Sequence, residues 1–157
     1  MLIMDAACRH RPRVLVADDD VEMRRLVAES LRRDEYEVTE ESDGGRLLVR
    51  VASVYSADRT IDRFDLIVSD IRMPVCSGLE ILKGLREAHW KTPVILMTAF
   101  GDEETKEYAE RLGALLIDKP FKMDVLRLVV RGLLHLDSEK DEPASGRRDE
   151  KETGEGS

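Results

Sequence analysis

Three consecutive carboxylates directly follow a short apolar run near the start of the chain. The stretch RVLVADDD, residues 13–20, ends in Asp18, Asp19 and Asp20. Carboxylates so close together repel one another and raise one another's pKa, so they need compensation in a folded protein. A solvated turn is one explanation, because Asp is common in turns. A bound cation is the other explanation. The residues that end the later apolar runs help to decide between the two.

Polar side chains also end three later apolar runs. Asp70 ends DLIVSD, Thr98 ends PVILMT, and Lys119 follows ALLID. Ligands of open parallel sheets bind beyond the carboxyl ends of the strands, so we expect these side chains to gather there. Three converging carboxylates favour a small hard cation with oxygen ligands, and Mg2+ fits that description. A carboxylate beside such a metal can attack phosphorus, while Lys119 and Thr98 could stabilise the phosphoryl oxygens.

The hydrophobic pattern predicts five strands that alternate with five helices. Each apolar run is followed by a segment with apolar residues at helical spacings of three and four. Parallel strands need crossover helices, so we expect a parallel sheet covered on both faces. Ser42 or Asp43 is expected to cap the second helix, Ser77 the third, and Gly113 to end the fourth. The expected strands are RVLVA (13–17), YEVTEES (36–42), DLIVSD (65–70), TPVILMTA (92–99) and ALLID (114–118).

Length and composition suit one folded domain. The chain has 157 residues, of which 42% are hydrophobic, enough for one core. We expect a folded body at 11–136 between a flexible N-terminus at 1–10 and a disordered polar tail at 137–157. The net charge of -8 argues against direct nucleic-acid binding. Without an export signal or an apolar run of about 20 residues, we expect no membrane association. Two widely separated cysteines favour the cytoplasm.

With these motifs in this order, the chain resembles the receiver domains of two-component response regulators. The resemblance spans about Arg13 to Leu136 and rests on VLVADDD, LIVSDIRMP, VILMTA and DKPF. It implies an α/β, flavodoxin-like, doubly wound five-stranded parallel sheet of order 2-1-3-4-5 with five helices. It also implies a phosphoacceptor signalling domain rather than an enzyme with turnover. Its expected partners are a sensor histidine kinase or phosphotransfer protein and a downstream protein target.

Carried over residue by residue, the resemblance assigns the acidic positions. Asp70 would accept the phosphoryl group from a kinase phosphohistidine. Asp19, Asp70 and the backbone carbonyl of Arg72 would ligate Mg2+, and Asp18 would help through a bound water. Asp20 matches no site position and is expected to begin the first helix.

The remaining positions concern the response to phosphorylation. Thr98 would move toward the phosphoryl group, Lys119 would pair with it, and the Lys119-Pro120 bond is expected to be cis. The face made by the fourth helix, fifth strand and fifth helix would then change, with homodimerisation on phosphorylation as a hypothesis. The chain departs from the family pattern at Leu116, where an aromatic residue is usual. Residues 43–64 also form a segment longer than the family's second helix and following loop, with no function assigned.

Two other functions stay open. Haloacid dehalogenase-like phosphatases also use an Asp nucleophile, Thr, Lys and Mg2+, but they carry D-x-D-x-[TV] after the first strand. This chain has Asp18, Asp20 and then Glu22, and it lacks a late acidic pair and a cap insertion. The other alternative is a receiver-like docking module without phosphotransfer, which the departure at Leu116 leaves open.

Overall fold

Five short parallel strands form one sheet in the computed structural model, which describes residues 10–56, 63–99 and 101–140. Neighbouring strands lie in the order β2-β1-β3-β4-β5, and every pair is parallel. The predicted fold class and strand order are therefore confirmed. The strands are β1 (Arg13–Ala17), β2 (Glu37–Glu41), β3 (Leu66–Asp70), β4 (Val94–Thr98) and β5 (Leu115–Asp118).

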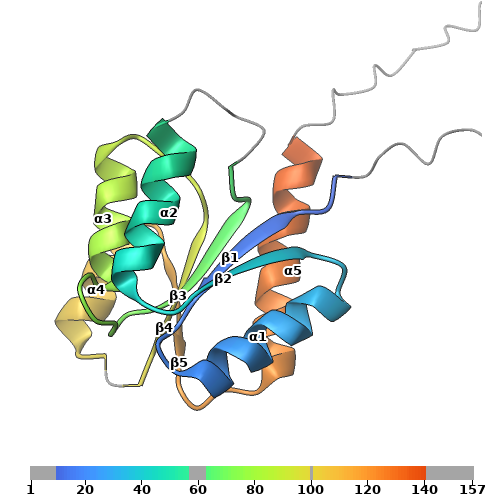
Figure 1. Cartoon of the computed structure of the whole chain (residues 1–157), viewed down its shortest axis with the longest axis horizontal. Helices are drawn as coiled ribbons and strands as arrows, with labels where there is room; N and C mark the ends of the chain where they lie inside the picture. The colour runs from blue at the N-terminus through green and yellow to red at the C-terminus, as the bar shows by residue number, and fades with distance from the viewer. Residues whose placement is uncertain (1–9, 57–62, 100, 141–157) are drawn as a thin grey trace, which may run out of the picture.

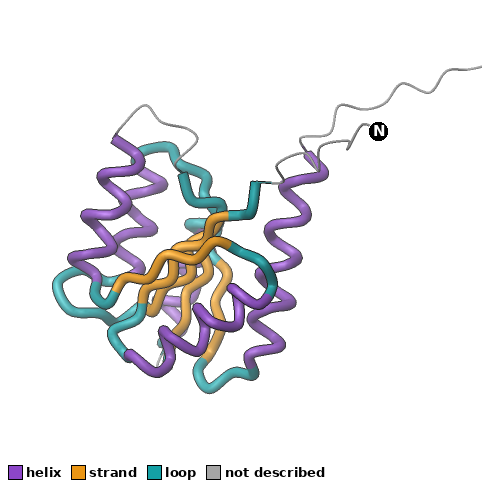
Figure 2. Tube along the Cα trace, turned by 45° about the vertical axis from the view of Figure 1, so that its right-hand side comes forward, coloured by secondary structure: helices purple, strands orange, loops and turns teal. Residues whose placement is uncertain are grey.

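Helices cover both faces of the sheet. Helices α1 and α5 lie on one side and α2, α3 and α4 on the other (Figure 1), and Figure 2 shows the sheet between two helical layers. This arrangement follows from parallel pairing, because each crossover helix packs back onto a sheet face. The helices are α1 (Val21–Arg33), α2 (Gly44–Ser56), α3 (Gly78–Glu87), α4 (Glu103–Arg111) and α5 (Met123–Lys140).

The core consists of two apolar clusters, one on each face of the sheet. Alternate residues of β1 divide between them: Val14 and Val16 pack in the cluster with α1 and α5, and Leu15 and Ala17 in the other. Strands β3 and β4 are buried along their whole length, as expected for the central strands of a covered parallel sheet. On α2, Leu47 and Val51 are buried in the core, whereas Leu48 is 48% exposed.

Side-chain caps mark where the first three helices begin. Asp20 caps α1 by accepting the N–H groups of the first turn at 3.0 and 3.2 Å, as predicted. Asp43 rather than Ser42 takes this position before α2, where its Oδ1 accepts the Arg46 N–H at 2.8 Å. Ser77 forms a reciprocal capping box at the start of α3. Each cap satisfies backbone donors that a helix start leaves unpaired.

The last helix extends past its expected end. Helix α5 continues to Lys140, so the boundary expected after Leu136 falls inside a helix. The flexible segment expected at 1–10 and the tail expected from 137 lie outside the described residues except for His10 and 137–140, and so do residues 57–62 of the long segment 43–64. None of the helices in the described ranges combines the length and apolar composition needed to span a bilayer.

One arginine joins the loop after α3 to the end of α4. The Arg86 guanidinium donates to the carbonyls of Leu112 at 2.7 Å, Trp90 at 2.6 Å and Thr92 at 3.0 Å. Burial lowers the pKa of this guanidinium. Three carbonyls thus share one charged donor, which makes Arg86 a structural link between the loop before β4 and the end of α4.

We expect Arg86→Met to destabilise the protein by about 2–3 kcal/mol, because three carbonyls lose a charged donor while the apolar stem is kept. Urea unfolding followed by far-UV circular dichroism measures the change. Lys83→Met is the matched control on the same helix, since the Lys83 ion pair with Glu87 at 3.8 Å is exposed and contributes little. Equal midpoints for the two variants would contradict this role of Arg86.

Val75 adopts a backbone conformation that β-branched residues avoid. It lies in the loop after β3 with φ at 74°, and its side chain is 87% exposed. The Cys76 N–H donates to the Pro74 carbonyl at 2.9 Å, which closes a three-residue γ-turn around Val75. The Gly44 N–H donates to the same carbonyl at 3.2 Å, so α2 holds the turn in place.

Val75→Gly is expected to raise the free energy of unfolding by about 1 kcal/mol, because relief of the left-handed conformation outweighs the entropy cost of glycine. Val75→Ala, which keeps a Cβ atom, should gain less. Thermal and urea unfolding compare the two variants with the wild type. A loss of stability in Val75→Gly would show that the exposed side chain contributes more than its backbone conformation costs.

Candidate functional site

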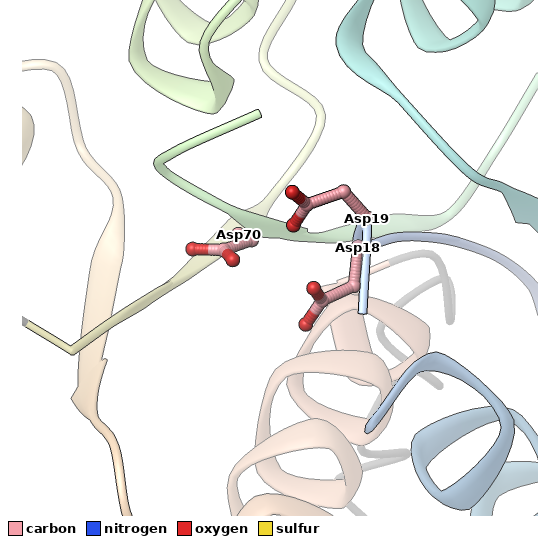
Figure 3. A group of neighbouring side chains, drawn as sticks. All are labelled: Asp18, Asp19 and Asp70. Atoms are coloured by element: carbon pink, nitrogen blue, oxygen red, sulfur yellow. The ribbon is translucent and has the colours of Figure 1, made fainter. Parts of the chain in front are cut away.

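Three carboxylates meet at the carboxyl edge of the sheet. Asp18 and Asp19 directly follow β1, and Asp70 is the last residue of β3. One carboxylate oxygen of each lies within 4.8 Å of the others, and Figure 3 shows the three side chains grouped beyond the two strand ends. We expected from the sequence that these residues gather, and the pairing of β1 with β3 brings them together.

Lys119, which follows the edge strand β5, bonds to two of these carboxylates. Its Nζ donates to Asp18 Oδ2 at 2.9 Å and to Asp70 Oδ2 at 3.2 Å. Its side chain is only 16% exposed. Burial alone would lower the Lys119 pKa, but the hydrogen bonds and charges of Asp18 and Asp70 outweigh it and raise that pKa. The lysine is therefore held in its charged form.

Asp18 is the most constrained of the three acids. Its side chain is fully buried, its Oδ1 accepts the Asp20 N–H at 3.0 Å, and its Oδ2 accepts from Lys119. Burial raises the Asp18 pKa, although the bonds from Lys119 and Asp20 oppose that shift. Asp19 is exposed. Two adjacent residues of one type therefore have different surroundings.

Thr98 and Arg72 flank the acidic cluster. Thr98 ends β4, is 3% exposed, and its carbonyl accepts the Lys119 N–H at 2.7 Å. The Arg72 N–H donates to Asp70 Oδ1 at 3.3 Å. The Lys119-Pro120 bond is cis, as expected. All six expected site residues thus lie around one sheet edge, whereas the roles expected of the Arg72 carbonyl and the Thr98 hydroxyl stay predictions.

Sequence reasoning missed two residues beside the site. A Cβ atom at Gly78 would lie 2.4 Å from the Asp70 carbonyl oxygen, so only glycine lets α3 start this close to the end of β3. Its place directly after the Ser77 cap was the available signal. Arg24 of α1 donates from Nη1 to the Asp18 carbonyl at 2.9 Å, a contact between residues six apart that no sequence motif indicates.

The charges at this edge do not balance within the described side chains of the cluster. Three carboxylates face one ammonium group, which leaves two formal negative charges when all are ionised. Oxygen donors, excess negative charge and one exposed member match what a hard divalent cation requires. The residues therefore fit a metal ion such as Mg2+, and Asp19 is the acid of the three to which Lys119 donates no hydrogen bond.

Comparison with known proteins shows the family. The model of the response regulator receiver domain matches residues 14–131. The chain belongs to this family. It is 35% identical over 131 residues to regulatory protein AtoC of Escherichia coli, a match that covers 83% of this chain and 27% of AtoC. It is 32% identical over 127 residues to sporulation initiation phosphotransferase F of Bacillus subtilis, covering 80% of this chain and 96% of that protein.

Solved receiver structures share the fold. The receiver domain of the Francisella response regulator 1452 matches with a TM-score of 0.70 and 30% identity, over 81% of this chain and 99% of that one. Chemotaxis protein CheY4 of Vibrio cholerae matches with a TM-score of 0.65 and 31% identity, over 79% and 99%. The chain spans only about a quarter of AtoC and about half of CpxR, two of its curated relatives.

Proposed function

We propose that this receiver domain accepts a phosphoryl group on Asp70 from the phosphohistidine of a sensor histidine kinase or phosphotransfer protein, in a Mg2+-dependent reaction. The observation that carries the proposal is the Lys119 ammonium, which lies against Asp70 and Asp18 at once. A partly buried carboxylate with a fixed cation and two acidic neighbours suits attack on a dianionic phosphoryl group, because positive charge must meet the incoming oxygens.

In the proposed reaction, a carboxylate oxygen of Asp70 attacks phosphorus while the phosphorus–nitrogen bond of the donor breaks. When the other ring nitrogen of the phosphohistidine carries a proton, the products are an acyl phosphate and a neutral imidazole. Asp19, Asp70 and the Arg72 carbonyl would hold Mg2+, with Asp18 acting through a water. The metal supplies positive charge for the phosphoryl oxygens. Lys119 moves its hydrogen bond from Asp70 to the phosphoryl group, and Thr98 donates its hydroxyl to another oxygen.

The output of this domain is a changed protein-binding face. Phosphorylation adds a charge of about -1.5 to -2 and three acceptor oxygens at Asp70. Thr98 and Lys119, at the ends of β4 and β5, are the residues that respond, and a downstream protein reads the face of α4, β5 and α5. We place this activity in the cytoplasm, limited to self-phosphorylation and autodephosphorylation. Membership in the receiver family does not favour the phosphatase or docking-module alternatives.

Acetyl phosphate with Mg2+ should label the wild type and fail to label Asp70→Asn. In this assay the phosphorus–oxygen bond of acetyl phosphate breaks and acetate leaves, so no kinase is needed. A phosphate-affinity gel separates the two forms, and EDTA should abolish the shifted band. Labelling of Asp70→Asn equal to that of the wild type would contradict the assignment of Asp70.

The adjacent residues Asp19 and Asp20 provide a matched pair of variants that tests the proposed role of Asp19 in binding Mg2+. Asp19→Asn should lose most Mg2+ binding and labelling, because it removes one anionic ligand. Asp20→Asn should keep both, because Asn caps a helix as well as Asp and Asp20 serves α1. If Asp20→Asn lost Mg2+ binding as severely as Asp19→Asn, the proposed ligand set would be wrong.

Phosphorylation is expected to drive homodimerisation through the face of α4, β5 and α5. Leu115 and Val125 leave 44% and 48% of their surfaces exposed there. Sedimentation velocity with and without beryllofluoride, which mimics the acyl phosphate, should show a larger species only with the mimic and Mg2+. A monomer under both conditions would remove the dimer from the proposal.

A further inference from the structure

The backbone of Asp18 is fixed on both sides by groups from other elements. Its N–H donates to the Glu41 carbonyl of β2 at 3.3 Å, and its carbonyl accepts from Arg24 Nη1 of α1 at 2.9 Å. That carbonyl belongs to the peptide unit joining Asp18 to Asp19. Its orientation therefore sets the direction in which the chain enters Asp19, whose carboxylate is exposed.

The Arg24 guanidinium is itself held in place. Its side chain is only 14% exposed, and its Nε lies 3.5 Å from Glu40 Oε1. The second oxygen of Glu40 accepts from Arg32 Nη2 at 3.0 Å. Glu40 therefore orients Arg24 and balances its charge, so that the hydrogen bond to the Asp18 carbonyl adds a rigid support near the acidic cluster.

We infer that Arg24 is a positioning residue for the metal site, acting through the Asp18–Asp19 peptide. The inference rests on the proposed function and deepens it. The Asp19 carboxylate must face Asp70 at the paired ends of β1 and β3, and rotation of its peptide would turn it away. Groups that orient metal ligands from behind alter metal affinity strongly without touching the ion.

Helix α1 has anchors in the fold other than Arg24. Helix α1 is capped by Asp20, and Val27 and Leu31 anchor it in the core with no exposed surface. The fold of α1 therefore does not depend on Arg24, and its removal should act mainly at the turn after β1. This separation makes the inference measurable.

The test is the Mg2+ dissociation constant of the full chain, measured by isothermal titration calorimetry well below the melting temperature. We expect Arg24→Met to weaken binding about 10-fold, while Arg25→Met, an exposed neighbour on the same helix, leaves it unchanged. Arg24→Lys should restore part of the affinity because one donor still reaches the carbonyl. Glu40→Gln should weaken binding less than Arg24→Met, since the guanidinium keeps its bond to Asp18.

A metal-free measurement reports on the same contact. Amide hydrogen exchange of the Asp20 N–H, which donates to Asp18 Oδ1, should accelerate in Arg24→Met and stay unchanged in Arg25→Met. Wild-type Mg2+ affinity in Arg24→Met, or equal losses in Arg24→Met and Arg25→Met, would overturn the inference. Failure of the wild type to bind Mg2+ or to take label from acetyl phosphate would instead overturn the proposed function, so the two failures are distinguishable.

Discussion

Repulsion among the carboxylates at one sheet edge is the constraint around which this domain is built. Two unit charges 4 Å apart repel by about 4 kcal/mol at the effective dielectric of a protein surface. The Lys119 ammonium offsets part of this cost by bonding to Asp18 and Asp70 together. It can do so only because β5 ends at the same edge as β1 and β3, with β4 between them. The strand order is thus what allows Lys119 to reach both Asp18 and Asp70.

Strand register then decides which side chains meet. Ala17 pairs with Ser69, so Asp18 comes level with Asp70 one residue later. Thr98 pairs with Asp118, which places Lys119 one residue beyond Thr98. Slipping β1 by a single residue would turn each of its side chains to the opposite face, and Asp18 would no longer lie level with Asp70. The register of β1 against β3 is therefore a requirement of the acidic cluster.

The sequence predicted what depends on local pattern. Apolar runs located the strands. Asp20 was expected to begin the first helix and Ser77 to cap the third, because helix starts depend on interactions within a few residues. The end of α5 was placed too early, since a polar composition does not by itself stop a helix. Arg24 and Arg86 could not be assigned, because the carbonyls they bond belong to turns whose positions exist only in the folded chain.

The three acids acquire different chemistry from position rather than from residue type. Asp18 is fully buried, and both of its carboxylate oxygens accept hydrogen bonds. Because Asp18 has no exposed surface, a phosphoryl donor cannot reach its carboxylate directly. Asp70 keeps 9% of its surface exposed and lies at the strand end beside the Lys119 ammonium. Asp19 is exposed. One fully buried, one mostly buried and one exposed carboxylate together form a site that none of them could form alone.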